Sequence, residues 1–137
     1  MKYQIIRAGE NRSFPEDHPL MAGGQDSGEV ASATADRFVW RHIDRIVAAG
    51  TTERHEIYEP MGEIDSAPAH LEFLAEWQIG HAAYLDGRFE AALAGFHAAA
   101  ELRPEDGPCR LFIERCSSFL RDGTPAGWDG TWHFDRK

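Results

Sequence analysis

The side chains of this 137-residue chain that could do chemistry are mainly histidines and two cysteines. His81 and His97 fall on neighbouring predicted helices and could face each other, but no Cys or carboxylate joins them at a metal-ligand spacing. Cys109 and Cys116 lie seven residues apart on one predicted helix, which separates their Cα atoms by roughly 10 Å. A disulfide needs less than about 7 Å. We therefore expect two buried thiols on one helix face, with a redox or metal role as the alternative.

Other residue types with catalytic potential do not form a recognisable pattern. Ser32 and Ser66 lack the G-x-S-x-G surroundings of a helix-entry nucleophile. The segment Glu105-Asp106-Gly107 is a turn before a helix, without the twelve-residue ligand pattern of a calcium loop. We expect no catalytic, cofactor-binding or metal-binding residues in this chain, and no cofactor.

Composition excludes several classes of partner. The net charge of −9 argues against nucleic acid and against anionic membrane surfaces, since both are polyanions. No run of 18 apolar residues is present, and the start of the chain has no apolar segment typical of a secretory signal. The expected location is therefore cytoplasmic, and 137 residues suffice for one domain, or one with a small addition.

The first half of the chain predicts strands. Residues 3–7 could form a short strand, and residues 9–29 are rich in Gly, Pro, Ser and Asp, which predicts a loop or partial disorder. Residues 37–47 predict a strand, residues 49–52 a turn, and residues 54–59 a return strand that Pro60 ends. Strict alternation would place Phe38, Trp40, His42, Asp44 and Ile46 on one face and Val39, Ile43 and Val47 on the other.

The second half predicts three helices, over about 66–86, 88–102 and 108–122, bounded by Gly and Pro. The tail from Gly127 could be a short strand or an extended segment that packs its tryptophans. The apolar face expected for the first helix consists of Leu71, Leu74, Trp77, Ile79, Ala82 and Ala83. The third helix is expected to present Leu111, Phe112, Ile113, Cys116, Phe119 and Leu120.

The segment from Ile79 to Pro104 resembles one tetratricopeptide (TPR) helical hairpin. Ile79-Gly80 match its Leu-Gly pair, Gly87 its turn, and Pro104 its closing proline. The resemblance implies that small residues let the two helices approach closely while aromatic residues fill the gaps. An ordinary helical hairpin with an apolar stripe is the alternative. The residues expected to pack or to make interactions are Trp77, Gly80, Phe89, Ala92, Phe96, Ala99, Trp128 and Trp132.

The predicted strand pair resembles the C-terminal end of a class III adenylate/guanylate cyclase catalytic domain. That family closes its domain with an Arg-x-x-Asp strand, a Val-Lys-Gly-Lys turn and a strand reading Val-x-Ile-Tyr-Glu-x-x-Gly. Many bacterial members then carry a TPR-like extension, a Pro-x-Asp-Gly-Pro turn, an Arg-Cys pair and a Trp-Asp-Gly tail. The matching residues here are Arg41 to Asp44, Gly50, Ile57-Tyr58-Glu59, Gly62, Gly87 to Phe96, Pro104 to Pro108, Arg115-Cys116 and Trp128-Asp129-Gly130.

Two departures from the family concern its chemistry. The metal-binding aspartates, the base-selecting residues and the Asn/Arg pair lie upstream in the family, and no counterpart precedes residue 30. The lysine-bearing turn reads Ala48-Ala49-Gly50-Thr51, so both lysine positions carry neutral side chains. Phosphoryl chemistry needs metal ions and cations to offset its negative charge. We therefore do not expect this chain alone to bind nucleotides or to act as an enzyme.

Together these observations predict an α+β fold: a small antiparallel β-hairpin element, a three-helix TPR-like unit and an extended C-terminal tail. The expected segments are an N-terminal strand and flexible loop (1–29), a cyclase-end-like β-hairpin (30–62) and a TPR-like helical extension with a Trp-rich tail (63–137). The leading hypothesis is a non-catalytic regulatory or protein-interaction module of cyclic nucleotide signalling, which binds a protein partner or itself. Alternatives are an independent TPR-like adaptor and a cyclase completed by another chain.

Overall fold

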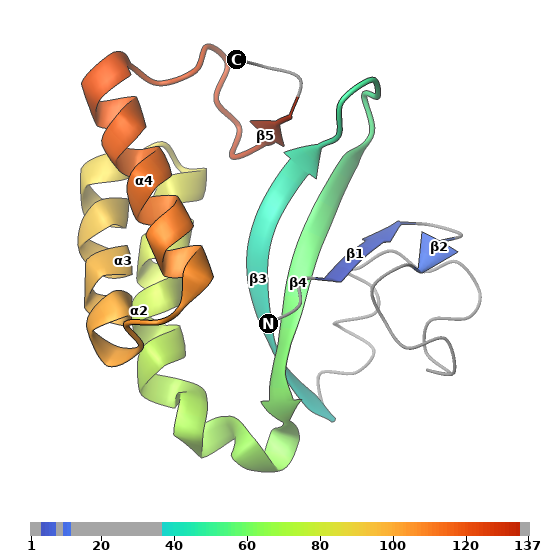
Figure 1. The fold of residues 1–137 in the computed structure, drawn as a ribbon, viewed down its shortest axis with the longest axis vertical. Helices are drawn as coiled ribbons and strands as arrows, with labels where there is room; N and C mark the ends of the chain where they lie inside the picture. Colours follow the sequence, from blue (N-terminus) through green and yellow to red (C-terminus); the bar gives the residue numbers. More distant parts are fainter. Residues whose placement is uncertain (1–3, 8–9, 12–36, 135–137) are drawn as a thin grey trace. The chain divides into compact units, whose positions relative to one another are not determined.

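The computed structural model describes residues 4–7, 10–11 and 37–134, which form two compact units. One unit contains the residues up to Pro68 together with those from Thr131, and the other runs from Ala69 to Gly130. The first is built around a β-sheet and the second around three helices (Figure 1). The predicted α+β class is therefore confirmed. Most of the loop expected over residues 9–29 lies outside the described residues.

A long hairpin forms the centre of the sheet. Strand β3 (Phe38–Val47) pairs antiparallel with β4 (Arg54–Glu63). The chain reverses at Gly50, whose φ of 80° is a left-handed conformation that glycine adopts without steric cost. The turn is closed by a hydrogen bond in which the Thr51 amide donates to the Ala48 carbonyl at 3.2 Å. The strand, turn and return strand thus lie close to where the residue types predict them.

The strict alternation expected for β3 is wrong, because the strand contains a bulge at Ile43. His42 pairs with Tyr58 but Asp44 pairs with Ile57, so Ile43 is the extra residue on the β3 side of the ladder. An extra residue in one strand moves the side chains that follow it to the opposite phase of the alternation. Ile43 and Asp44 are consequently both buried, although they are neighbours.

The residue types predicted that Pro60 ends the return strand. This prediction is wrong, because β4 continues to Glu63. The register shifts between Val39 and Trp40, so that Trp40 pairs with Pro60 at a second irregularity. Proline is tolerated in a strand at such a bulge, where the regular ladder of hydrogen bonds is already interrupted. The prediction failed because it treated proline as a terminator without knowledge of the pairing.

Three short strands extend the sheet around this hairpin, in the order β2-β1-β4-β3-β5. Strand β1 (Gln4–Arg7) pairs antiparallel with β4 and with β2 (Glu10–Asn11). Strand β5 (Trp132–His133) lies beside the end of β3 and runs parallel to it. Two strands alone are marginally stable in water. These additions extend the hairpin into a five-stranded sheet.

The helical unit contains α2 (Ala67–Leu85), α3 (Phe89–Leu102) and α4 (Gly107–Asp122), and a 3-10 turn, η2 (Ile64–Ser66), precedes α2 (Figure 1). Helix α4 has a complete start signal. The Asp106 side chain accepts a hydrogen bond from the Cys109 amide at 3.0 Å, and Pro108 occupies the first turn. Gly87, with φ of 82°, lies in the tight turn between α2 and α3. None of the described helices has the length and hydropathy that a membrane crossing requires.

The apolar faces expected for α2 and α4 are partly wrong. Leu71 and Ile79 of α2, and Leu111 and Leu120 of α4, are exposed rather than buried. Trp77 and Ala83 of the predicted face are buried, as expected. The other buried residues of α2 were not in the predicted set: Phe73, Gly80, His81 and Tyr84. The prediction selected aliphatic residues on both sides of α2, and only packing shows which side is covered.

Candidate functional site

The crossing of α2 and α3 is built on small residues. A Cβ atom placed on Gly80 would lie 2.9 Å from the backbone nitrogen of Phe96 and 3.0 Å from the Ala92 carbonyl oxygen. A larger residue at position 80 would therefore force the helices apart. Ala92 and Ala99 of α3 are fully buried along the same helix. The close approach that the TPR resemblance implies is thus present in this hairpin.

Aromatic side chains fill the space among the three helices. Trp77 lies 5.1 Å from Phe96 and 5.6 Å from Phe112 between ring centroids, so one side chain from each helix meets at this point. Tyr84 contacts Phe112 edge to face at 4.7 Å, and His81 stacks on Trp77 at 5.5 Å. Such pairs stabilise a core beyond the area that they bury. These rings serve packing and leave no aromatic platform open for a ligand at this cluster.

Trp128 closes the other end of the helical core. Its ring lies 5.2 Å from Tyr84, 5.5 Å from Phe89 and 5.3 Å from Phe119. Its indole N–H donates to the Tyr84 carbonyl at 3.0 Å, which satisfies the polar end of the side chain. The structure does not place Trp132 in this cluster. Trp132 pairs with Ile46 in the sheet, so the two tail tryptophans belong to different units.

Two arginines of the helical unit have structural roles that the sequence did not indicate. Arg115 of α4 is buried, donates to the Tyr84 hydroxyl at 3.1 Å and lies 4.9 Å above the Phe112 ring. Arg103, just after α3, lies 4.4 Å above the ring of Phe73 and donates to the His70 imidazole at 2.8 Å. Burial, together with the charge of Arg103, lowers the pKa of His70. A guanidinium stacked on an aromatic ring is a recurrent packing contact.

The cysteines and histidines do not combine into a reactive site within the described residues. Cys109 and Cys116 are both buried thiols, as predicted for two cysteines on one helix. Burial raises the pKa of Cys116 to about 11 despite the neighbouring Arg115 charge, which makes this thiol inert near neutral pH. His81 is buried whereas His97 is exposed. In the described part of the chain, no three His, Cys, Asp or Glu side chains are grouped to hold a metal ion.

In the hairpin, the cyclase-like motif residues pair with each other. Arg41 lies directly opposite Glu59, and its Nε donates to the carboxylate at 2.9 Å, with a second contact from the terminal nitrogen. Both side chains are fully buried, so the pair takes part in packing the sheet. Both residues match the family motif in the sequence, but their contact was not predicted. Regular counting back from the turn would have placed Arg41 opposite Pro60, and only the bulge at Ile43 brings it to Glu59.

Half-buried side chains of the same hairpin form a second polar cluster. The Glu56 carboxylate contacts the His42 imidazole at 2.7 Å and accepts a hydrogen bond from Arg45 at 3.1 Å. The His42 ring stacks on Tyr58 at 4.8 Å. Burial by itself raises the pKa of Glu56, but the His42 hydrogen bond and the Arg45 charge more than offset it, so this pKa lies below its usual value.

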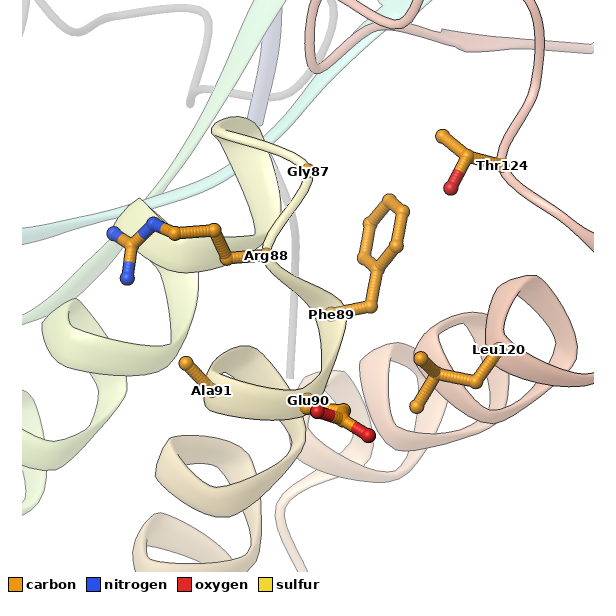
Figure 2. Close-up of a pocket in the computed structure, with 7 residues that line it drawn as sticks. All are labelled: Gly87, Arg88, Phe89, Glu90, Ala91, Leu120 and Thr124. Atoms are coloured by element: carbon orange, nitrogen blue, oxygen red, sulfur yellow. The ribbon is translucent and has the colours of Figure 1, made fainter.

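An open pocket of about 420 Å³ lies where the α2–α3 turn meets the end of α4. Figure 2 shows Phe89 between the α2–α3 turn on one side and the segment that carries Leu120 and Thr124 on the other. Arg88 and Glu90 supply one charge of each sign, and Arg88 also contacts Asp86 at 3.3 Å. The lining mixes apolar and charged groups without a buried polar side chain directed at a ligand.

Comparison with known proteins gives one informative similarity. The chain is 32% identical over 90 residues to "Adenylate cyclase, terminal-differentiation specific" of Dictyostelium discoideum. The matched region is 64% of this chain but only 4% of that protein's length. No protein family model matches the chain. No solved structure matches it. The similarity supports a cyclase-related region in this chain.

Proposed function

We propose that the chain is a non-catalytic regulatory or protein-interaction module related to the C-terminal region of adenylate/guanylate cyclases. The observation that carries the interaction role is the exposure of large apolar side chains on α2, where Leu71 is 64% and Ile79 is 60% exposed. The rest of the helical unit buries its aromatic residues in a closed core. Exposed apolar residues grouped on an otherwise packed unit mark a surface that another protein covers.

The non-catalytic part of the proposal rests on the hairpin. At the turn where the resembling family carries lysines, this chain has Ala49 and Thr51, both neutral and exposed. Farther along the strands, the charged motif residues Arg41 and Glu59 are buried and paired with each other. Transfer chemistry on a triphosphate needs cationic groups directed at the substrate. The similarity to a Dictyostelium adenylate cyclase supports the relation to that family, within the 90 matched residues.

The proposal is tested with two measurements on the full chain. Incubation with Mn-ATP and with Mn-GTP is expected to give no cyclic product above a blank, while an active cyclase domain in parallel gives a clear signal. Product that increases in proportion to the concentration of this chain would overturn the non-catalytic assignment. Binding to a purified class III cyclase catalytic domain, measured by co-sedimentation, is expected to be saturable. Complete lack of binding would argue against a regulatory role toward cyclases.

A second candidate is an independent TPR-like adaptor, which the separate compactness of residues 69–130 favours. Such an adaptor would bind a partner through its helices but would show no affinity for a cyclase domain. A fragment of residues 69–130 that binds the cyclase domain as well as the full chain does would place the contact in the helices. A full chain that binds an amphipathic helix but no cyclase domain would favour the adaptor.

A further inference from the structure

The exposed face of α2 is a continuous apolar stripe. Leu71, Ala75, Ile79 and Ala82 follow one another at helical spacing, and all four are exposed. Leu71 and Ile79 are eight residues apart, which corresponds to about 12 Å along the helix axis. Ala75, between them, and Ala82, beyond Ile79, have small side chains. The helix surface is therefore lower at the alanines than at Leu71 and Ile79. A face of this shape can receive bulky side chains from a second helix.

This stripe is separate from the core of the helical unit. The opposite side of α2 carries the buried residues, which include Phe73, Trp77 and Tyr84. An ordinary surface helix is polar on the side away from its core. Helix α2 is instead apolar on both sides, so its outer side has a preference for burial that the three-helix core does not satisfy.

The charged side chains that α2 itself carries are acidic. Glu72 is exposed and Glu76 half-buried on α2, within a turn of Leu71 and Ile79. Neither α2 nor α3 contains a Lys or Arg, whereas α3 adds Glu90 and Glu101. The two helices therefore combine an apolar stripe with carboxylates, while Arg103, just after α3, is engaged with the His70 imidazole and the Phe73 ring. A partner that matches both properties has an apolar face flanked by basic residues.

Two other occupants are disfavoured by the same charges. A second copy of α2 packed on the stripe would bring Glu72 and Glu76 close to their own counterparts, and like charges at a contact cost binding energy. Residues 12–36 of this chain contain five acidic residues and one basic residue, Arg12. That segment would also be repelled. The five acidic residues are Glu16, Asp17, Asp26, Glu29 and Asp36.

We propose that the Leu71–Ala75–Ile79–Ala82 stripe binds a basic amphipathic helix of a partner protein. This inference rests on the proposed function as an interaction module and names the chemistry of its partner. Bulky apolar side chains of the partner lie between Leu71 and Ile79, over Ala75. Its Lys or Arg side chains lie against Glu72 and Glu76. Apolar anchors supply most of the affinity, and the charges supply selectivity and a dependence on salt.

The test uses the full chain and two labelled helical peptides of about 18 residues, long enough for five turns. Both peptides carry leucines at helical spacing. One has lysines beside the leucines, and the other has glutamates at the same positions. Fluorescence anisotropy is expected to show binding of the lysine peptide that weakens as salt rises, with the glutamate peptide at least about tenfold weaker.

Substitutions locate the contact. Leu71→Glu and Ile79→Glu, both at exposed positions, should each weaken the lysine peptide about tenfold or more. The matched control is Leu111→Glu, which changes a leucine of α4 that is 44% exposed and should leave binding unchanged. Circular dichroism checks that each variant is folded. The double reversal Glu72→Lys with Glu76→Lys avoids the apolar positions and should reverse the preference between the two peptides.

Four results would overturn this inference. Equal affinity for the two peptides, or no affinity for either, would contradict the proposal that the partner helix is basic. If Leu111→Glu weakened binding of the lysine peptide as much as the stripe variants do, the stripe would not be the binding site. Sedimentation that shows the chain to self-associate, with Leu71→Glu abolishing that association, would assign the stripe to a second copy. A cyclase domain that still binds the Leu71→Glu and Ile79→Glu variants would reject this site but leave the proposed function intact.

Discussion

Gly80 of α2 and Gly95 of α3 meet backbone to backbone. A Cβ atom added at Gly95 would lie 2.5 Å from the amide nitrogen and 2.6 Å from the Cα of Gly80. Both atoms belong to a helix backbone, which cannot move aside as the end of a side chain can. The separation of the two helices is therefore set by the absence of a side chain at each of these positions.

Gly95→Ala is expected to destabilise the helical unit by about 1–3 kcal/mol, because the added methyl group forces α2 and α3 apart. We expect this net destabilisation even though the intrinsic helix propensity of alanine is about 1 kcal/mol more favourable than that of glycine. Urea denaturation followed by circular dichroism measures the change. Ala94→Ser, at the exposed neighbouring position, is the control and should stay within about 0.5 kcal/mol of wild type. A more stable Gly95→Ala variant would contradict the observed contact.

Phe96→Ala should cost about 3–5 kcal/mol, because the ring is fully buried between Trp77 and Phe112. That loss is a large part of the roughly 5–15 kcal/mol available to a domain, so the melting temperature should fall by many degrees. Thermal unfolding of Leu111→Ala, a truncation at an exposed position, serves as the comparison. Similar melting curves for Phe96→Ala and wild type would show that the helical core is arranged differently.

Acid should weaken the hairpin through Glu56. Its pKa is lowered in the folded chain, so its contacts with His42 and Arg45 stabilise the fold above the ordinary pKa of 4.5, and this contribution is lost as pH falls through the folded pKa. The stability difference between wild type and Glu56→Gln should be largest near neutral pH and shrink below about pH 4.5. Denaturation series at several pH values measure it. Glu53→Gln, at an exposed position before β4, is the control, and an identical pH dependence in both variants would refute the assignment.

The two cysteines should resist alkylation in the folded protein. Cys109 and Cys116 are buried, and burial raises the pKa of Cys116 to about 11, so it remains a protonated thiol at pH 8. Reaction with a thiol reagent should be slow without denaturant and rapid for both thiols in guanidinium. Ala126→Cys places a thiol at an exposed position and should react quickly under native conditions. Fast labelling of Cys116 in the folded chain would mean that α4 opens readily.

Local sequence signals determined most element types and several boundaries. Several signals influence the backbone only within a few residues of their own position. They are the turn glycines at positions 50 and 87, the Pro after α3 and the Asp106-Gly107-Pro108 start of α4. Their backbone preferences therefore predicted where strands and helices begin and end. The α+β class followed from the change of apolar period between the two halves of the chain. The small and aromatic positions of α3 were likewise readable, because their helical spacing places them on one face.

Contacts between distant residues decided what the local signals left open. The bulge at Ile43 depends on how β3 pairs with β4, and that pairing also brings Arg41 to Glu59 and keeps Pro60 inside a strand. Apolar residues on both sides of α2 made its buried side ambiguous, and only packing against α3 and α4 covered the aromatic side and left Leu71 exposed. A side chain's burial depends on which surfaces meet it. Which surfaces pack together is decided by the whole fold, and this information is not contained in any short stretch of sequence.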